Sequence, residues 1–210
     1  MESSLLVHDI FISISEHQAK KIGILLNTHT PMNILQIGCG NGDSTYWIEK
    51  LYTHTHKHTV VDHEEKFIQS TKQLIKKHKL LLPQFIHSSS QIFLASRPRK
   101  NYYDFCLLDG DERFDGCLTD WFYLKDLINK EGIVVMRNIW NPSVRKVISF
   151  ILKNYPFVLT ETSSIDNIFL KIPWLHDFWL ERLGRKKWLD LCVLKKIDED
   201  KRNWNHYVRF

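Results

Sequence analysis

Short apolar runs alternate with amphipathic segments along most of this chain. The apolar runs are Asn33 to Ile37, Thr59 to Asp62, Gln84 to His87, Tyr103 to Asp109, Gly132 to Met136 and Phe157 to Thr160. Each is brief and rich in Val, Ile, Leu or Phe, which is typical of strands covered on both faces. The alternation predicts a doubly wound, mostly parallel α/β sheet with helices on both faces. In such sheets ligands bind beyond the carboxyl ends of the strands.

The intervening segments carry helix signals. Ser15 and Gln18 form a capping box, in which each side chain bonds the other residue's backbone amide. Apolar positions recur at helical spacing in the later segments, and Asn141-Pro142 reads as an N-cap followed by the first helical residue. The predicted helices are Ser15 to about Leu26, Glu64 to about Lys79, Asp115 to about Asn129 (burying Leu118, Trp121, Phe122 and Ile128), and Asn141 to Tyr155.

Regularity weakens after Pro156. The pattern there allows a strand at Ile168 to Ile172, a short aromatic helix at Trp174 to Leu180, and a last strand at Leu191 to Ile197. No linker divides the chain, so residues 1–210 are expected to form one domain: a core (15–162), an aromatic insertion (163–188), and the last strand with a tail (189–210). The aromatic stretch is interpreted as core packing or a homodimer contact, with a substrate lid as the alternative.

Composition and charge limit the kinds of partner expected for this chain. The chain has 210 residues, 43% hydrophobic and 25% charged, which is typical of soluble globular proteins. It shows neither an apolar run of membrane-spanning length nor a signal peptide, so a cytoplasmic protein without a membrane partner is expected. The net charge is +5, but in residues 181–210 nine Lys/Arg and five Asp/Glu alternate in sign. This favours ion pairing over nucleic-acid binding.

The chemistry-bearing segment follows the first strand. Gly38-Cys39-Gly40-Asn41-Gly42 is a GxGxG loop that leads into a helix, which indicates a nucleoside-bearing ligand. The dinucleotide fingerprint needs a small residue at its sixth position, where this chain has Asp43. A carboxylate there repels a pyrophosphate and suits a cation. The loop therefore favours a zwitterionic adenosyl cofactor over a nicotinamide dinucleotide.

Two acids stand at the ends of predicted strands. Asp62 ends the second strand, where a carboxylate can accept both hydroxyls of a ribose. The alternative is that Asp62 caps the helix that begins near Glu64. Asp109 follows three apolar residues at the end of the fourth strand, a functional position more often than a structural one.

With these residues in place, the sequence resembles the class I S-adenosylmethionine-dependent methyltransferases from about Ser15 to Pro156. Within them it is most similar to the small-molecule and sugar O-methyltransferases, whose fourth strand ends in Asp-Gly-Asp-His. The resemblance implies a Rossmann-like sheet of seven strands, the last antiparallel, with S-adenosylmethionine as cofactor and a small-molecule or sugar hydroxyl as acceptor. The cofactor-binding residues it implies are Gln36, Gly38, Cys39, Gly40, Gly42, Ser44, Asp62, His63, Ser89 and Asp109.

The sequence departs from this family at three places. Gln36 replaces the usual acid before the glycine loop, and the run Ser88 to Ser90 replaces an acid near the adenine amine. After the fifth strand, where metal-dependent members carry an acid, stand Arg137 and Asn138. Mg²⁺ is held through few carboxylates, so no catalytic metal is expected. Arg137 is expected to supply the missing positive charge.

Asp109 is the predicted catalytic residue, as a sulfonium stabiliser, an orienting group for the cofactor's amino-acid end, or a general base. Further candidate bases are His87, Asp111, Glu112 and His176. Competing hypotheses are a non-catalytic binding protein of the same fold and a nicotinamide-dependent oxidoreductase. The alternating His54, His56 and His58 suggest a metal site, which the expectation of a solvated loop disfavours.

Overall fold

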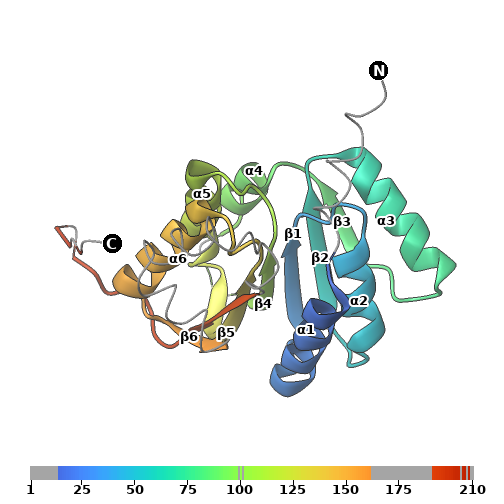
Figure 1. Cartoon of the computed structure of the whole chain (residues 1–210), viewed down its shortest axis with the longest axis horizontal. Coiled ribbons are helices and arrows are strands. Elements are labelled where there is room, and N and C mark those ends of the chain that lie inside the picture. Colours follow the sequence, from blue (N-terminus) through green and yellow to red (C-terminus); the bar gives the residue numbers. More distant parts are fainter. Residues whose placement is uncertain are drawn as a thin grey trace, which may run out of the picture.

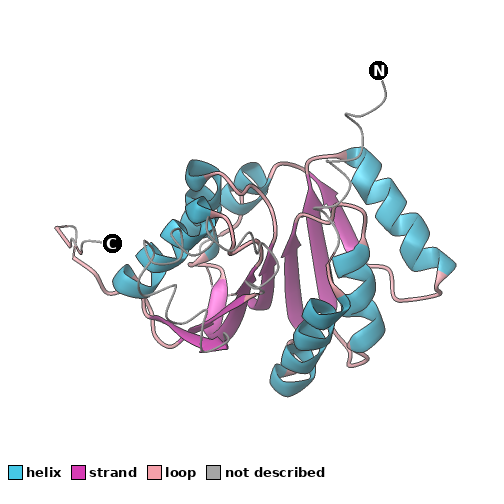
Figure 2. Ribbon diagram, viewed as in Figure 1, coloured by secondary structure: helices cyan, strands magenta, loops and turns pink. Residues whose placement is uncertain are grey.

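The structure is a computed structural model that describes residues 14–98, 100, 102–161, 191–203, 205–206 and 208. The expected insertion (163–188) with its helix, strand and dimer contact lies outside this part of the chain, as does His176. Seven strands form one sheet, flanked by helices on both faces (Figure 2). No helix in the described ranges is long and apolar enough to cross a membrane.

The elements follow the predicted alternation. The strands are β1 (Asn33–Ile37), β2 (Lys57–Asp62), β3 (Gln84–His87), β4 (Tyr103–Leu108), β5 (Ile128–Met136), β6 (Phe157–Glu161) and β7 (Cys192–Lys196). The helices are α1 (Glu16–His29), α2 (Asp43–Leu51), α3 (Glu65–Lys77), α4 (Ser90–Ala95), α5 (Phe114–Leu124) and α6 (Pro142–Asn154).

The sheet order is β3-β2-β1-β4-β5-β7-β6. Strands β1 to β5 pair in parallel, and β7 pairs antiparallel with both β5 and β6. The predicted doubly wound sheet with an antiparallel seventh strand is confirmed. The chain order reverses direction between β1 and β4, which is where a ligand cleft is expected in such a sheet.

Side chains alternate between two cores along the central strands β1, β4, β5 and β7. Leu35 and Ile37 of β1 belong to the core beneath α4, α5 and α6, whereas Ile34 belongs to the core beneath α1 and α2. Figure 1 shows these two groups of helices on opposite sides of the strands. Because both faces are covered there, β1, β4 and the second half of β5 are buried along nearly their whole length, as the sequence predicted.

The prediction for the fifth helix and the following strand was wrong in extent. Helix α5 ends at Leu124 rather than near Asn129, and β5 already begins at Ile128 rather than at Gly132. Phe122, predicted to be buried, is 46% exposed. The pairing of β4 with β5 contains an irregularity, since Tyr103 faces Ile128 but Phe105 faces Ile133. The short helix α4 was not predicted.

Candidate functional site

A cleft of about 540 Å³ lies at the carboxyl ends of β1, β2 and β4. It occupies the predicted position at the reversal of strand order. Its lining residues are Ile37, Gly38, Gly40, Val61, Asp62, His63, Phe67, Ser89, Ser90, Gln91, Asp109, Gly110, Asp111, Glu112 and Arg113.

The glycine loop forms one wall of the cleft in a conformation that needs glycine. Gly38 has φ +82°, and a Cβ on it would lie 2.2 Å from the carbonyl oxygen of Asp109. Gly42 has φ +94° and packs against Thr71. Gly40, with φ +47°, lines the cleft itself. A residue with a side chain would be strained at positive φ and would collide with the neighbouring backbone. Glycine avoids both, so the loop can pass directly beside the strand ends.

Gln36 orients this loop from beneath, as expected. It is fully buried; its Nε2 donates to the Gly38 carbonyl at 2.9 Å, and its Oε1 accepts from the Thr45 hydroxyl at 3.1 Å. Cys39, Gly42 and Ser44 also pack behind the wall, and burial raises the pKa of Cys39 to about 12. Of the ten expected cofactor-binding residues, six line the cleft and these four support it.

Asp62 has a role that the sequence did not predict. Its Oδ2 accepts from the backbone amides of Cys39 (2.8 Å) and Gly40 (3.3 Å), and its Oδ1 accepts from the amide of Glu64 (2.9 Å). The carboxylate therefore holds the glycine loop against the end of β2. The alternative that Asp62 is the N-cap of the following helix was wrong, because Glu64 is the N-cap residue of α3 and no side-chain bond caps it. A carboxylate has about four acceptor positions, so one remains for a ligand hydroxyl. The expected capture of both ribose hydroxyls stays a prediction.

Asp109 lies within a polar network that joins the ends of β4 and β5. Arg137 Nη1 donates to its Oδ2, and Asn138 Nδ2 donates to its Oδ1 at 3.1 Å. Burial raises the pKa of Asp109 to about 6, and the Arg137 guanidinium opposes a further rise. The carboxylate is thus ionised near neutral pH, and both oxygens are engaged. The expectation that Arg137 brings a positive charge here is confirmed.

Two more carboxylates line the mouth of the cleft. Asp111 bonds Arg113, with its Oδ1 3.0 Å from Arg113 Nε, so its charge is balanced. Glu112 accepts one amide on each oxygen, from Asn138 (2.7 Å) and from Asn141 (3.2 Å). Each Glu112 oxygen keeps an acceptor position. The cleft therefore presents more negative than positive charge, which suits a cationic ligand.

The lining residues that the sequence analysis did not name for the site include Phe67, Gln91 and Arg113. Phe67 belongs to α3, and Gln91 lies in the unpredicted helix α4. Conversely, His87 is an expected base that does not line the cleft; its Nε2 lies 3.0 Å from the His63 carbonyl. His63 itself lines the cleft and is largely exposed.

No protein-family model and no curated protein matches this chain. Solved structures do match it. An O-methyltransferase from Bacillus cereus in complex with SAH is 14% identical, with TM-score 0.63 over 90% of this chain and 84% of that one. The O-methyltransferase TomG from Streptomyces achromogenes, in complex with SAM, is 15% identical, with TM-score 0.62 over 89% and 82%. A methyltransferase from Geobacter sulfurreducens is 9% identical, with TM-score 0.65 over 89% and 81%. The chain therefore has the Rossmann-like methyltransferase fold.

Proposed function

We propose that this protein binds S-adenosylmethionine in the cleft and transfers its methyl group to a hydroxyl of a small molecule or sugar without a metal ion. The observation that carries the proposal is that the Gly38–Gly40 backbone, Asp62 and Asp109 border one cleft at the reversal of strand order. The fold shared with SAH- and SAM-bound O-methyltransferases supports it.

The lining residues fit such a cofactor. Gly40 lets its backbone approach a ligand, and Asp62 keeps one acceptor position for a ribose hydroxyl. Ser89 and Gln91 offer hydrogen-bonding groups for the edge of a base, and Phe67 offers an apolar face. The excess of carboxylates suits a sulfonium and an ammonium group. When bound, the cofactor supplies an electrophilic methyl group.

A hard divalent cation does not fit beside Asp109. Mg²⁺ needs free carboxylate oxygens, whereas both Asp109 oxygens already accept, from Arg137 and Asn138. The Arg137 guanidinium also repels a dication at close range. Arg137 thus takes the place that an ion would need, which supports metal-independent transfer.

The hydrogen-bond partners of the three carboxylates indicate a different role for each. Asp109 is paired with the Arg137 guanidinium and acts as an electrostatic and orienting group. Asp111 is neutralised by Arg113. Glu112 accepts from the neutral side-chain amides of two asparagines, and it lines the cleft, so it is the proposed general base for the acceptor hydroxyl. Orientation of the two reactants can lower the activation free energy by roughly 7 to 11 kcal/mol.

Calorimetric titration with S-adenosylmethionine, its demethylated product and NAD tests the cofactor. We expect micromolar binding of the first two and none of NAD. Gly40→Val should abolish binding because it fills the cleft wall, whereas Asn41→Val, at the adjacent exposed loop position, should not. Preference for NAD would support an oxidoreductase. Unchanged binding by a folded Gly40→Val variant would refute the placement of the cofactor.

Turnover against a panel of phenolic and sugar hydroxyl compounds, with excess chelator, tests the chemistry. We expect chelator-resistant transfer that Glu112→Gln slows about 10²-fold or more. Activity that vanishes with chelator and returns with Mg²⁺ would overturn metal independence. Cofactor binding without turnover on any acceptor would favour the non-catalytic alternative.

A further inference from the structure

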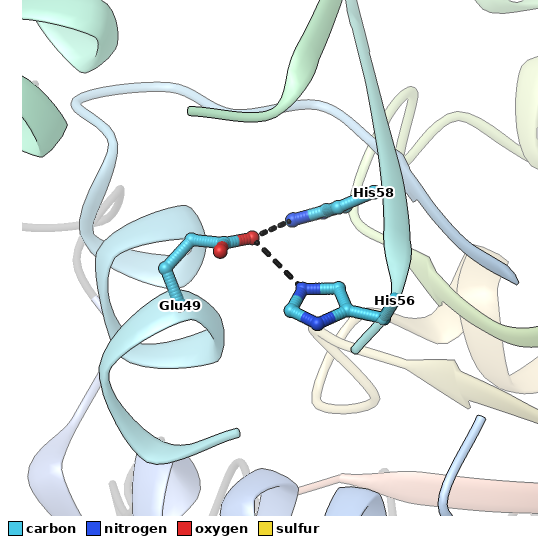
Figure 3. A group of neighbouring side chains, drawn as sticks. All are labelled: Glu49, His56 and His58. Atoms are coloured by element: carbon cyan, nitrogen blue, oxygen red, sulfur yellow. Dashed lines mark hydrogen bonds and ion pairs between the residues drawn. The ribbon is translucent and has the colours of Figure 1, made fainter. Parts of the chain in front are cut away.

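A second group of polar side chains lies at the other end of β2, away from the cleft. Glu49 comes from the end of α2, His56 from the turn before β2, and His58 from β2 itself (Figure 3). All three side chains are at most 2% exposed. The expectation that these histidines lie in a solvated loop was wrong for His56 and His58, although His54 is exposed. Asp62 lies four positions after His58, which is about 13 Å along a strand.

The three side chains converge on one point. Glu49 Oε1 lies 2.7 Å from His58 Nδ1 and 3.3 Å from His56 Nε2, and one ligand atom of each residue lies within 4.8 Å of the others. Donor atoms around a tetrahedral ion, each bound at about 2.1 Å, stand roughly 3.4 Å apart. Side-chain shifts of under about 1 Å would thus admit a cation at the centre of this triangle.

One oxygen of Glu49 is unsatisfied. Glu49 Oε2 is buried without a hydrogen-bond partner among the described residues, and so is His58 Nε2, although Nδ1 is the His58 nitrogen that faces Glu49. A buried carboxylate oxygen without a partner has lost its hydration and gained no hydrogen bond in return. The two imidazoles both face the same oxygen of Glu49, and the other oxygen has no partner. A divalent cation would be attracted by the charge that both oxygens share.

His56 is held in the orientation of a metal ligand. Its Nδ1 lies 2.7 Å from the His54 carbonyl oxygen, which can only accept, so Nδ1 carries a proton. Its Nε2 is the nitrogen that faces Glu49. Metal-bound histidines usually donate their other ring N–H to a carbonyl or carboxylate in this way, which fixes the ring and the tautomer.

We propose that Glu49, His56 and His58 form a binding site for a divalent transition-metal cation, with Zn²⁺ as the best match to two imidazoles and one carboxylate. Imidazole ligands disfavour Mg²⁺ and Ca²⁺, which prefer oxygen. Three protein ligands leave one tetrahedral position for water. Because the site joins the end of α2 to the start of β2, on the side opposite the cleft, it stabilises the fold and takes no part in methyl transfer.

The test uses the full chain, stripped with chelator and then titrated with zinc sulfate. We expect one Zn²⁺ per chain by elemental analysis, a rise in melting temperature, and visible absorption typical of four-coordinate Co²⁺ after cobalt loading. His56→Gln should remove the tight site. His54→Gln is the matched control, because His54 contributes only its backbone carbonyl.

Several outcomes would overturn the proposal. They are a wild-type chain that binds no Zn²⁺, a His56→Gln variant that keeps the wild-type stoichiometry, or a His54→Gln variant that loses as much. The chain has 11 histidines and four cysteines, which can bind Zn²⁺ weakly elsewhere. The two variants distinguish such binding from binding at the proposed site. His58 lies within β2 and its replacement risks misfolding, so Glu49→Gln serves as the second test.

Discussion

At the scale of single residues, Asp62 shows how one carboxylate serves both the loop and the ligand. Two of its three amide bonds hold the glycine loop, the third goes to Glu64, and the residue lines the cleft. We predict that Asp62→Asn lowers cofactor affinity and the free energy of unfolding together, each by about 1.5 to 3 kcal/mol. Calorimetric titration and urea unfolding measure the two effects.

Glu64→Gln is the control for Asp62→Asn. Asp62 bonds only the backbone amide of Glu64, and the Glu64 side chain is 41% exposed, so both quantities should stay near wild type. A variant Asp62→Asn that loses affinity at unchanged stability would show that the loop does not depend on this carboxylate.

Asp120 on α5 should make the free energy of unfolding depend on pH. It is fully buried, and burial raises its pKa to about 6, with Ser90 and Gln91 opposing a further rise. The folded state binds this proton more tightly than the unfolded state, so its contribution to stability is greatest below about pH 4. It is lost as the pH rises through 6. Asp120→Asn should raise the unfolding free energy at pH 8 by up to about 3 kcal/mol and have little effect at pH 4.

Urea unfolding at several pH values measures this effect. Asp115→Asn, at an exposed position of the same helix, should show no comparable gain. A constant difference between Asp120→Asn and wild type across the pH range would contradict the assignment.

At the scale of helices and strands, local signals predicted best where the side chains make local contacts. The capping box of α1 is present: Gln18 N donates to Ser15 Oγ at 3.2 Å, and Ser15 N donates to Gln18 Oε1 at 3.0 Å. Ser15→Ala should lower the unfolding free energy by about 1 kcal/mol, measured by urea unfolding. Ser70→Ala, an exposed helical serine, should change it less. Equal effects would mean that the cap contributes nothing.

Prediction failed where distant residues decide the structure. Leu118, Trp121 and Ile128 fit helical spacing, so the predicted helix extended beyond the observed end of α5 at Leu124. In the fold, Lys196 of β7 donates to the Ile128 carbonyl at 2.9 Å, a contact across 68 residues that favours strand there. The same holds for the residues of the site. The glycine loop and the strand-end acids were predictable, whereas the Arg137–Asp109 pair and the convergence of Glu49 with two histidines depend on which elements become neighbours.

At the scale of the whole molecule, β7 joins the sheet together. In the described sheet, β6 pairs only with β7, and β7 connects it to β5. A chain ending at residue 190 should therefore lose cooperative unfolding, monitored by circular dichroism during heating. A chain ending at residue 203 keeps β7 and should unfold cooperatively at near wild-type temperature. Cooperative unfolding of the shorter chain would show that β5 and β6 do not need β7.

This strand order also has a consequence during synthesis. When residue 161 has emerged from the ribosome, β5 and β6 exist but the strand that separates them is still 31 residues from its start. Both strands then present open edges, which are templates for pairing with other chains. The nascent protein passes through a stage prone to aggregation, and the speed of translation over residues 162–196 sets how long that stage lasts.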